Sequence, residues 1–159
     1  MNPNDVMPAY LPHEILTGEP TRSARLKWVI VVDESLAAGR QVNAVACVAA
    51  ATGAAIEGLQ GPGGTDASGY EHPGLAWAGC TVLGASAERL TTVRAKAVAA
   101  EADGVWVADM PQLAQTTRVY AEYRTELAAT APDQLGSLAL SIVGPRAVVD
   151  SIVKKLRLL

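Results

Sequence analysis

Residues 26–33 read LKWVIVVD, an almost continuous apolar run that is rich in valine. Such a run is typical of a central strand covered on both faces, because a strand with one wet face alternates apolar and polar side chains. The run ends at Asp33, and Gly39 precedes a long alanine-rich segment, residues 40–52, that stops at Gly53. We predict a buried helix with a glycine stop in this segment, directly after the strand.

Strands and helices are expected to keep alternating along the chain. A glycine-rich loop, residues 57–75, separates the first helix from the second strand and is long enough to be functional or mobile. The order β-α-β-α-β-α-β-α predicts an α/β protein, a three-layer α/β/α sandwich with a four-stranded mixed sheet. Residues 1–25 hold four prolines and are predicted to form an extended N-terminal arm, and residues 26–159 a single domain. The remaining strands are expected at 77–85, 105–107 and 138–143, and the remaining helices at 87–102, 111–129 and after Gly144-Pro145.

Composition limits the function classes. Half of the 159 residues are hydrophobic and 18% are charged, so the chain can bury a core. Apolar runs such as residues 44–51 are far shorter than the roughly 20 residues of a spanning helix. Residues 1–14 have neither the basic start nor the apolar block of a signal peptide. We therefore expect a cytoplasmic protein that does not bind a membrane.

Charge and cysteine content give further expectations about partners. The net charge is -3, with 13 basic and 16 acidic residues, whereas proteins that bind nucleic acids usually carry a basic surplus. We therefore do not expect tRNA as a partner. Cys47 and Cys80 are not in a metal-ligand spacing, and the sequence has neither a dinucleotide glycine fingerprint nor a phosphate-binding loop. We expect no metal and no cofactor.

The end of the first strand is the first candidate ligand site, because open α/β sheets bind ligands beyond the carboxyl ends of their strands. Asp33 leaves the strand there, and Gly39 and Arg40 begin the helix. A helix N-terminus beside an arginine can hold an anion. The alternative is that Gly39 only permits the turn and Arg40 is a solvated surface charge.

Two side chains of the apolar first helix are candidates as well. Asn43 and Cys47 lie four residues apart and hence on one helix face. An amide in an apolar helix is expected to be buried near the first strand and to bond the glycine-rich loop, above all Asp66 or the loop backbone. It would then either face a ligand or only hold the loop. Cys47 is expected to be a small core residue rather than a nucleophile.

Acid–base chemistry has three candidates outside this helix. In the glycine-rich loop, His72 is a possible acid or base, with Asp66 as the residue that orients it. The alternative is a turn aspartate and an exposed imidazole. Asp109 follows the third strand, at the same sheet edge as Asp33 if these strands are parallel. It would otherwise cap the following helix.

Two stretches resemble the fold of type 2 peptidyl-tRNA hydrolases. They are WVIVVDESLAAGRQVNAVACVAAATG at residues 28–53 and GSLALSIVGPRAVVDSIVKKLRLL at residues 136–159. Over residues 15–159, the chain more closely resembles a bacterial family known only as a domain of unknown function, number two thousand in its series. The motifs that carry this resemblance are TGEPTRSARLKWVIVVD at 17–33, Gly-x-x-x-Asn at Gly39–Asn43, DASGYEHPG at 66–74 and DMPQLAQTTRVYAEY at 109–123.

The hydrolase resemblance implies a site from which this sequence departs. The hydrolases carry Gly-Lys-x-Lys-x-x-x-Gln-x-x-His at the start of the first helix, and Asp109 matches the aspartate after their third strand. Their short Asp-Ala-Gly-x-Thr loop is replaced here by Met110-Pro111 and a predicted helix. Loss of the second, catalytic lysine removes a cation for the ester or phosphate, so we do not expect peptidyl-tRNA hydrolysis. The pattern positions are occupied by Gly39, Arg40, Val42, Ala46 and Ala49.

Three hypotheses follow for the function. The first is a small-molecule-binding or regulatory module that keeps the hydrolase-like fold without its lysine and binds an unknown ligand. The second is a divergent hydrolase of an aminoacyl, peptidyl or acyl ester, with Asp109 or His72 as base and Arg40 as anion clamp. The third is a homodimer formed through the alanine-rich helix faces. The expected ligand-binding residues are Asp33, Gly39, Arg40, Asn43 and Asp66, and the candidate catalytic residues are Asp109 and His72.

Overall fold

The strand Leu26–Asp33 (β1) lies at the centre of a five-stranded mixed sheet in a computed structural model, which describes residues 7–159. Its order is β5-β6-β1-β4-β7. β1 pairs in parallel with β4 (Thr81–Ala85) and antiparallel with β6 (Ser137–Pro145), which in turn pairs antiparallel with β5 (Trp106–Pro111). β1, β4 and β5 therefore run in one direction, and their carboxyl ends lie at the same edge of the sheet.

The expectation of four strands is wrong, because a fifth strand completes the sheet. β7 (Arg157–Leu158) follows the last helix and pairs antiparallel with β4. Just before it, Lys155 takes a left-handed backbone conformation with φ of 69°. A strand of two residues is too short to show an alternating pattern, so no sequence signal marks it.

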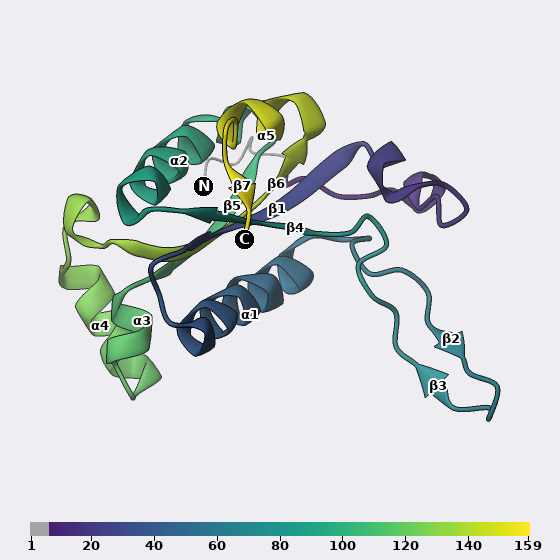
Figure 1. Cartoon of the computed structure of the whole chain (residues 1–159), viewed down its shortest axis with the longest axis horizontal. Helices are drawn as coiled ribbons and strands as arrows, with labels where there is room; N and C mark the ends of the chain where they lie inside the picture. Colours follow the sequence, from purple (N-terminus) through teal and green to yellow (C-terminus); the bar gives the residue numbers. More distant parts are fainter. Residues whose placement is uncertain (1–6) are drawn as a thin grey trace.

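Helices cover both faces of the sheet (Figure 1). α1 (Ala38–Ala55) lies on one face, and α2 (Ala87–Ala99) and α5 (Arg146–Ile152) lie on the other. Ile30 and Val32 of β1 pack toward α1, whereas the valines that alternate with them pack toward α2 and α5. The central strand is thus buried on both faces, as its continuous apolar run predicts, and the three layers are confirmed. Among residues 7–159, none of the helices combines the length and the hydropathy of a membrane-spanning segment.

The segment after β5 differs from the single helix expected at 111–129. It forms a short helix α3 (Leu113–Thr116) and a second helix α4 (Tyr120–Ala129), with a break at residues 117–119. Thr117 is extended at the break, with φ of -93° and ψ of 139°. Threonine and valine are weak helix formers because branching at Cβ restricts their rotamers, and both occur at this break.

The glycine-rich loop contains a hairpin that the sequence did not predict. Its strands are β2 (Gly64–Thr65) and β3 (Glu71–His72), and residues 60–76 are called the projecting hairpin below. Residues 62–73 are all exposed, and the hairpin extends past α1 on the side of the sheet that α1 covers (Figure 1). A Cβ atom at Gly74 would lie 1.8 Å from a carbonyl oxygen of the opposite strand, so glycine is required where the strands cross.

The N-terminal segment packs on the domain over its described part. Tyr10 and Ala24 are buried, and the Tyr10 hydroxyl donates a hydrogen bond of 3.0 Å to the carbonyl of Leu26. Burial raises the pKa of Tyr10 to about 12. Residues 1–6 of the predicted extended arm lie outside the described residues. Short 3-10 helices occur at Pro12–Glu14, Thr21–Ser23, Glu101–Asp103 and Pro132–Gln134.

Buried hydroxyl groups join α1 to the centre of the sheet. Thr52 of α1 donates its hydroxyl proton to the carbonyl of Val48 at 2.7 Å. The 2.6 Å contact between the Thr52 and Ser141 hydroxyls therefore takes its proton from Ser141. Ser141 in turn accepts 2.8 Å from the indole Nε1 of Trp28. Thr52 and Ser141 are fully buried, and both hydroxyls have partners, as buried polar groups require.

We expect Ser141→Ala to lower the free energy of unfolding by about 1–3 kcal/mol, because it leaves the Trp28 indole N–H without its acceptor and removes one of the two hydrogen bonds of the Thr52 hydroxyl. The measurement is equilibrium unfolding in urea. The matched control is Ser151→Ala, since Ser151 is exposed and its hydroxyl bonds the Val148 carbonyl of its own helix. Equal small losses for both variants would contradict a structural role for Ser141.

Candidate ligand-binding site

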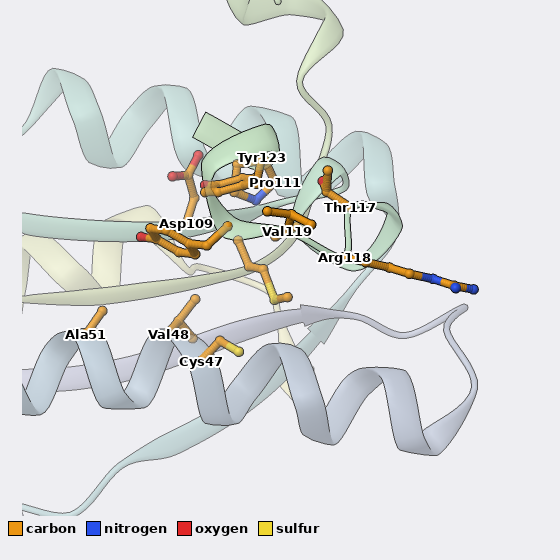
Figure 2. A pocket seen from close by; sticks show the side chains of 12 residues that line it. Cys47, Val48, Ala51, Asp109, Pro111, Thr117, Arg118, Val119 and Tyr123 are labelled. Carbon is orange, nitrogen blue, oxygen red and sulfur yellow. The ribbon is translucent and has the colours of Figure 1, made fainter. Parts of the chain in front are cut away.

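A cavity of about 400 Å³ lies between α1, the carboxyl end of β5 and the α3–α4 segment (Figure 2). α1 forms one wall, and the broken segment after β5 forms the opposite wall. Most of the lining residues are apolar or aromatic, which is usual for small-molecule sites of this size. The lining residues are Cys47, Val48, Ala51, Asp109, Met110, Pro111, Ala114, Thr117, Arg118, Val119, Tyr120 and Tyr123.

Asp109 and Tyr123 contribute polar groups to the wall of the cavity. The Oδ2 atom of Asp109 accepts a hydrogen bond of 2.6 Å from Nε of Arg94 in α2, and the two side chains form an ion pair. Among the described residues, no hydrogen bond engages the other carboxylate oxygen. Burial, and then the negative charges of Asp109 and Tyr120, raise the pKa of the Tyr123 hydroxyl. The cavity therefore offers a carboxylate acceptor beside a phenol that stays protonated at neutral pH.

A polar hollow adjoins the cavity on the other side of α3. Gln115 lines this hollow and accepts a hydrogen bond of 2.7 Å from Nε of Arg40. Its amide Nε2 donates to Oδ1 of Asn43 and to the carbonyl of Arg40, both at 3.0 Å. Ala114 lines both spaces. Gly39, Arg40 and Asn43, predicted at the start of the first helix, therefore meet α3 at this hollow.

The expectation that Asn43 is buried against the glycine-rich loop is wrong. Its side chain is exposed, and its partner is Gln115 of α3. The buried stripe of α1 consists of Ala44, Val48 and Thr52, at intervals of four residues. Asn43 precedes this stripe by one residue, which rotates it by about 100° out of the core.

The expectation that Cys47 is a core residue is wrong for the same reason. Its thiol is exposed and lines the cavity (Figure 2), so it is not a core residue. It lies one position before the buried Val48, as Asn43 lies before Ala44. The sequence places Asn43 and Cys47 on one face correctly, but that face lies at the side of the helix, toward α3 and the cavity, and not in the core.

Asp33 is buried at the carboxyl end of β1, where it holds the following turn. Its Oδ1 atom accepts hydrogen bonds from the amide and the hydroxyl of Ser35, at 2.9 and 2.7 Å. Asp109 lies within β5 and does not cap the helix that follows, so the alternative role as a cap is wrong. Both aspartates are at the expected sheet edge, because β1 and β5 run in one direction.

Asp66 and His72 belong to the projecting hairpin, which lies far from α3 and α4 (Figure 1) and contributes no residue to the lining of the cavity. Nε2 of His72 lies 3.3 Å from Oδ2 of Asp66, and both residues are exposed, so the acid–base role stays a prediction beside the alternative of a turn aspartate and an exposed imidazole. Oδ1 of Asp66 also accepts hydrogen bonds from the Ser68 hydroxyl at 2.6 Å and from the Ser68 and Tyr70 amides at 2.7 and 3.1 Å. Within one chain, His72 and Asp109 do not converge on one site. The predicted residues fall into three groups, which lie at the polar hollow beside α3, at the carboxyl ends of β1 and β5, and on the projecting hairpin.

Several residues of the site were not predicted. Tyr120 and Tyr123 are three residues apart, a spacing that places two aromatic rings on one helix face, so this signal was present in the sequence. Their ring centroids are 5.6 Å apart. Arg94 and Gln115 carry no such signal, because each reaches its partner only through the packing of separate elements.

The hydrogen bonds at Asp66 predict a pH response of the projecting hairpin. The Ser68 hydroxyl, the Tyr70 amide and His72 lower the pKa of Asp66 to about 2. A lowered pKa stabilises the turn above the ordinary aspartate pKa of about 3.9, and this stabilisation is lost as the pH falls toward the lowered value. We expect NMR titration of the Asp66 carboxyl group to give a midpoint near 2. Ser68→Ala should raise this midpoint, and an ordinary midpoint in the unmodified protein would contradict the prediction.

Comparison with known proteins gives the family and the fold. Residues 26–159 match a family described as "Protein of unknown function (DUF2000)". A solved structure, the protein of unknown function Atu0240 from Agrobacterium tumefaciens strain C58, is similar with a TM-score of 0.73 and 20% sequence identity. The match covers 85% of this chain and 98% of that chain, and at this identity it shows the fold alone. No curated protein matches in sequence. The relation to type 2 peptidyl-tRNA hydrolases stays a prediction, whereas the family match is direct: the chain belongs to the DUF2000 family.

Proposed function

We propose that this chain is a small-molecule-binding module whose ligand occupies the cavity between α1, β5 and the α3–α4 segment. The observation that supports this most is the pairing of an apolar cavity of about 400 Å³ with a carboxylate and a phenol in its wall. Ligand sites are typically concave, largely apolar and supplied with a few polar groups that fix orientation. This cavity combines all three features.

The wall chemistry defines a ligand class. Asp109 offers an acceptor, because Arg94 engages only one of its two carboxylate oxygens among the described residues. A matching ligand has an apolar body of about one or two rings and a hydroxyl or amino group that donates to Asp109. Arg118 extends into solvent beside the cavity, so an anionic group on the ligand would fit at the mouth rather than inside (Figure 2).

The alternative function for the same fold is hydrolysis of an ester. We propose that the chain is related to type 2 peptidyl-tRNA hydrolases in its fold but does not share their activity. Val42 stands where the hydrolase pattern has its catalytic lysine, and it is 68% exposed. Arg40, the proposed anion clamp, is bonded to Gln115. A site that lacks the cation and separates its two candidate bases favours binding over turnover.

Filling the cavity should abolish binding without unfolding the chain. Ala51 is exposed on α1 and lines the cavity, so we expect Ala51→Trp to remove the fluorescence gain of anilinonaphthalene sulfonate, an apolar probe. The matched control is Ala54→Trp, an exposed alanine of the same helix that does not line the cavity. Equal probe signals in both variants would contradict the assignment of the site.

A second test addresses the polar end of the cavity. We expect benzylamine, which carries a donor, to perturb the amide NMR signals around the cavity more strongly than toluene does. Asp109→Asn should weaken benzylamine binding by about tenfold or more, because hydrogen bonds to charged groups contribute about 1.5–3 kcal/mol. Toluene binding should not change. If the substitution weakens both ligands equally, the proposed role of Asp109 is wrong.

A further inference from the structure

The outer face of α1 is apolar, and no described segment of the chain covers it. Val42 is 68% exposed, and Ala46 and Ala50 are exposed on the following turns. Residues 41–56 contain no charged side chain. Surface helices ordinarily present charged or polar residues to water, so an uncharged outer face of this length indicates a covered surface.

The projecting hairpin is a second exposed feature beside this face. Tyr70 is 66% exposed and Leu75 is 79% exposed, although both are large apolar residues. The hairpin extends past α1 on the same side of the sheet (Figure 1). An isolated two-stranded hairpin is only marginally stable in water, so an ordered one benefits from a surface to rest on.

The two ends of α1 carry charges of opposite sign. Arg40 lies at its first turn, and Arg118 extends from the adjacent α3–α4 segment. At the other end, the chain continues into Glu57, and the hairpin carries Asp66 and Glu71. From residue 41 to residue 88 there is no lysine or arginine. The surface is thus basic at one end, apolar in the middle and acidic at the other end.

We propose that a second copy of this chain covers α1, with the two α1 helices packed antiparallel across a two-fold axis near residues 46–50. A two-fold axis places this surface against the same surface of the second copy, and the two surfaces then run in opposite directions. The acidic hairpin of each copy then lies against the basic α3–α4 end of the other. Alanine at positions 46 and 50 allows the helices to approach closely.

The size of the interface requires the hairpin as well as the helix. The uncharged face of α1 is about 20 Å long and about 10 Å wide, from the rise and diameter of an α-helix. Stable interfaces bury about 800 Å² per partner, several times the area of such a strip. The hairpin, with Tyr70 and Leu75, supplies additional contact beyond the end of the helix. In this dimer each hairpin approaches the cavity of the other copy, and Asp66 and His72 come near a site that they cannot reach within one chain.

The first experiment is sedimentation velocity from low to high micromolar concentrations. We expect the unmodified chain to be a dimer. Ala46→Arg should raise the dimer dissociation constant by roughly 100-fold or more, because it leaves an unpaired charge at the centre of the interface. The matched control is Ala95→Arg, an exposed alanine on α2 at the opposite face of the sheet, which should leave the dimer unchanged. Tyr70→Glu should also weaken the dimer.

A cross-linking measurement tests the same interface through the formation of a covalent dimer, so it does not depend on a variant that loses the dimer. In a background of Cys47→Ser and Cys80→Ser, oxidation of Ala50→Cys should join two chains through a disulfide near the axis, and Ala95→Cys should not. A chain that stays monomeric at high micromolar concentration, or a dimer that Ala46→Arg leaves intact, would overturn the proposal. The cavity lies within one chain, so anilinonaphthalene sulfonate binding to monomeric Ala46→Arg tests the ligand proposal separately.

Discussion

The hydroxyl of Ser141 fixes the rotation of α1 on the sheet, and the rest of the surface depends on that rotation. It bonds Thr52 of α1 and the indole of Trp28 at the centre of the buried sheet. With Thr52 directed inward, Ala44 and Val48 also face the core. A turn of about 100° per residue then directs one neighbouring row of α1 into the cavity and another into solvent. One buried network thereby sets both the ligand cavity and the uncovered face.

The cavity arises at an edge of the sheet, where packing is less complete than at the centre. β5 is the outermost strand next to β6, and its carboxyl end is followed by α3 rather than by a long covering helix. The break at residues 117–119 directs α4 so that Tyr120 and Tyr123 close the space from the side. Asp109 is placed there because β5 ends at the same sheet edge as β1. The site is therefore a product of strand direction and helix interruption together.

The sequence predicts the layers of this fold better than it predicts the site. Long apolar runs such as residues 26–33 and the alanine-rich helix carry strong periodic signals, and both elements occur where expected. β7 is only two residues long, which is too short for a periodic signal. Residues 117–119 interrupt a helix through backbone preferences that are too weak to predict the break from the sequence. Asn43 and Cys47 were placed on the correct common face, but an alanine-rich helix has small residues on every side, so its inward face is ambiguous in sequence. The partners Arg94 and Gln115 follow only from tertiary packing.

The composition of the projecting hairpin is hard to explain by the single chain alone. Its glycines lose more conformational entropy on ordering than other residues, and the hairpin buries little of its own surface to offset that cost. The hydrogen bonds at Asp66 organise the tip, and glycine at the crossing point keeps the strands close. These features shape the hairpin without burying Tyr70 or Leu75. An ordered segment with exposed apolar side chains is favoured when it has a complementary surface, and the uncharged face of α1 with its basic end has the matching chemistry.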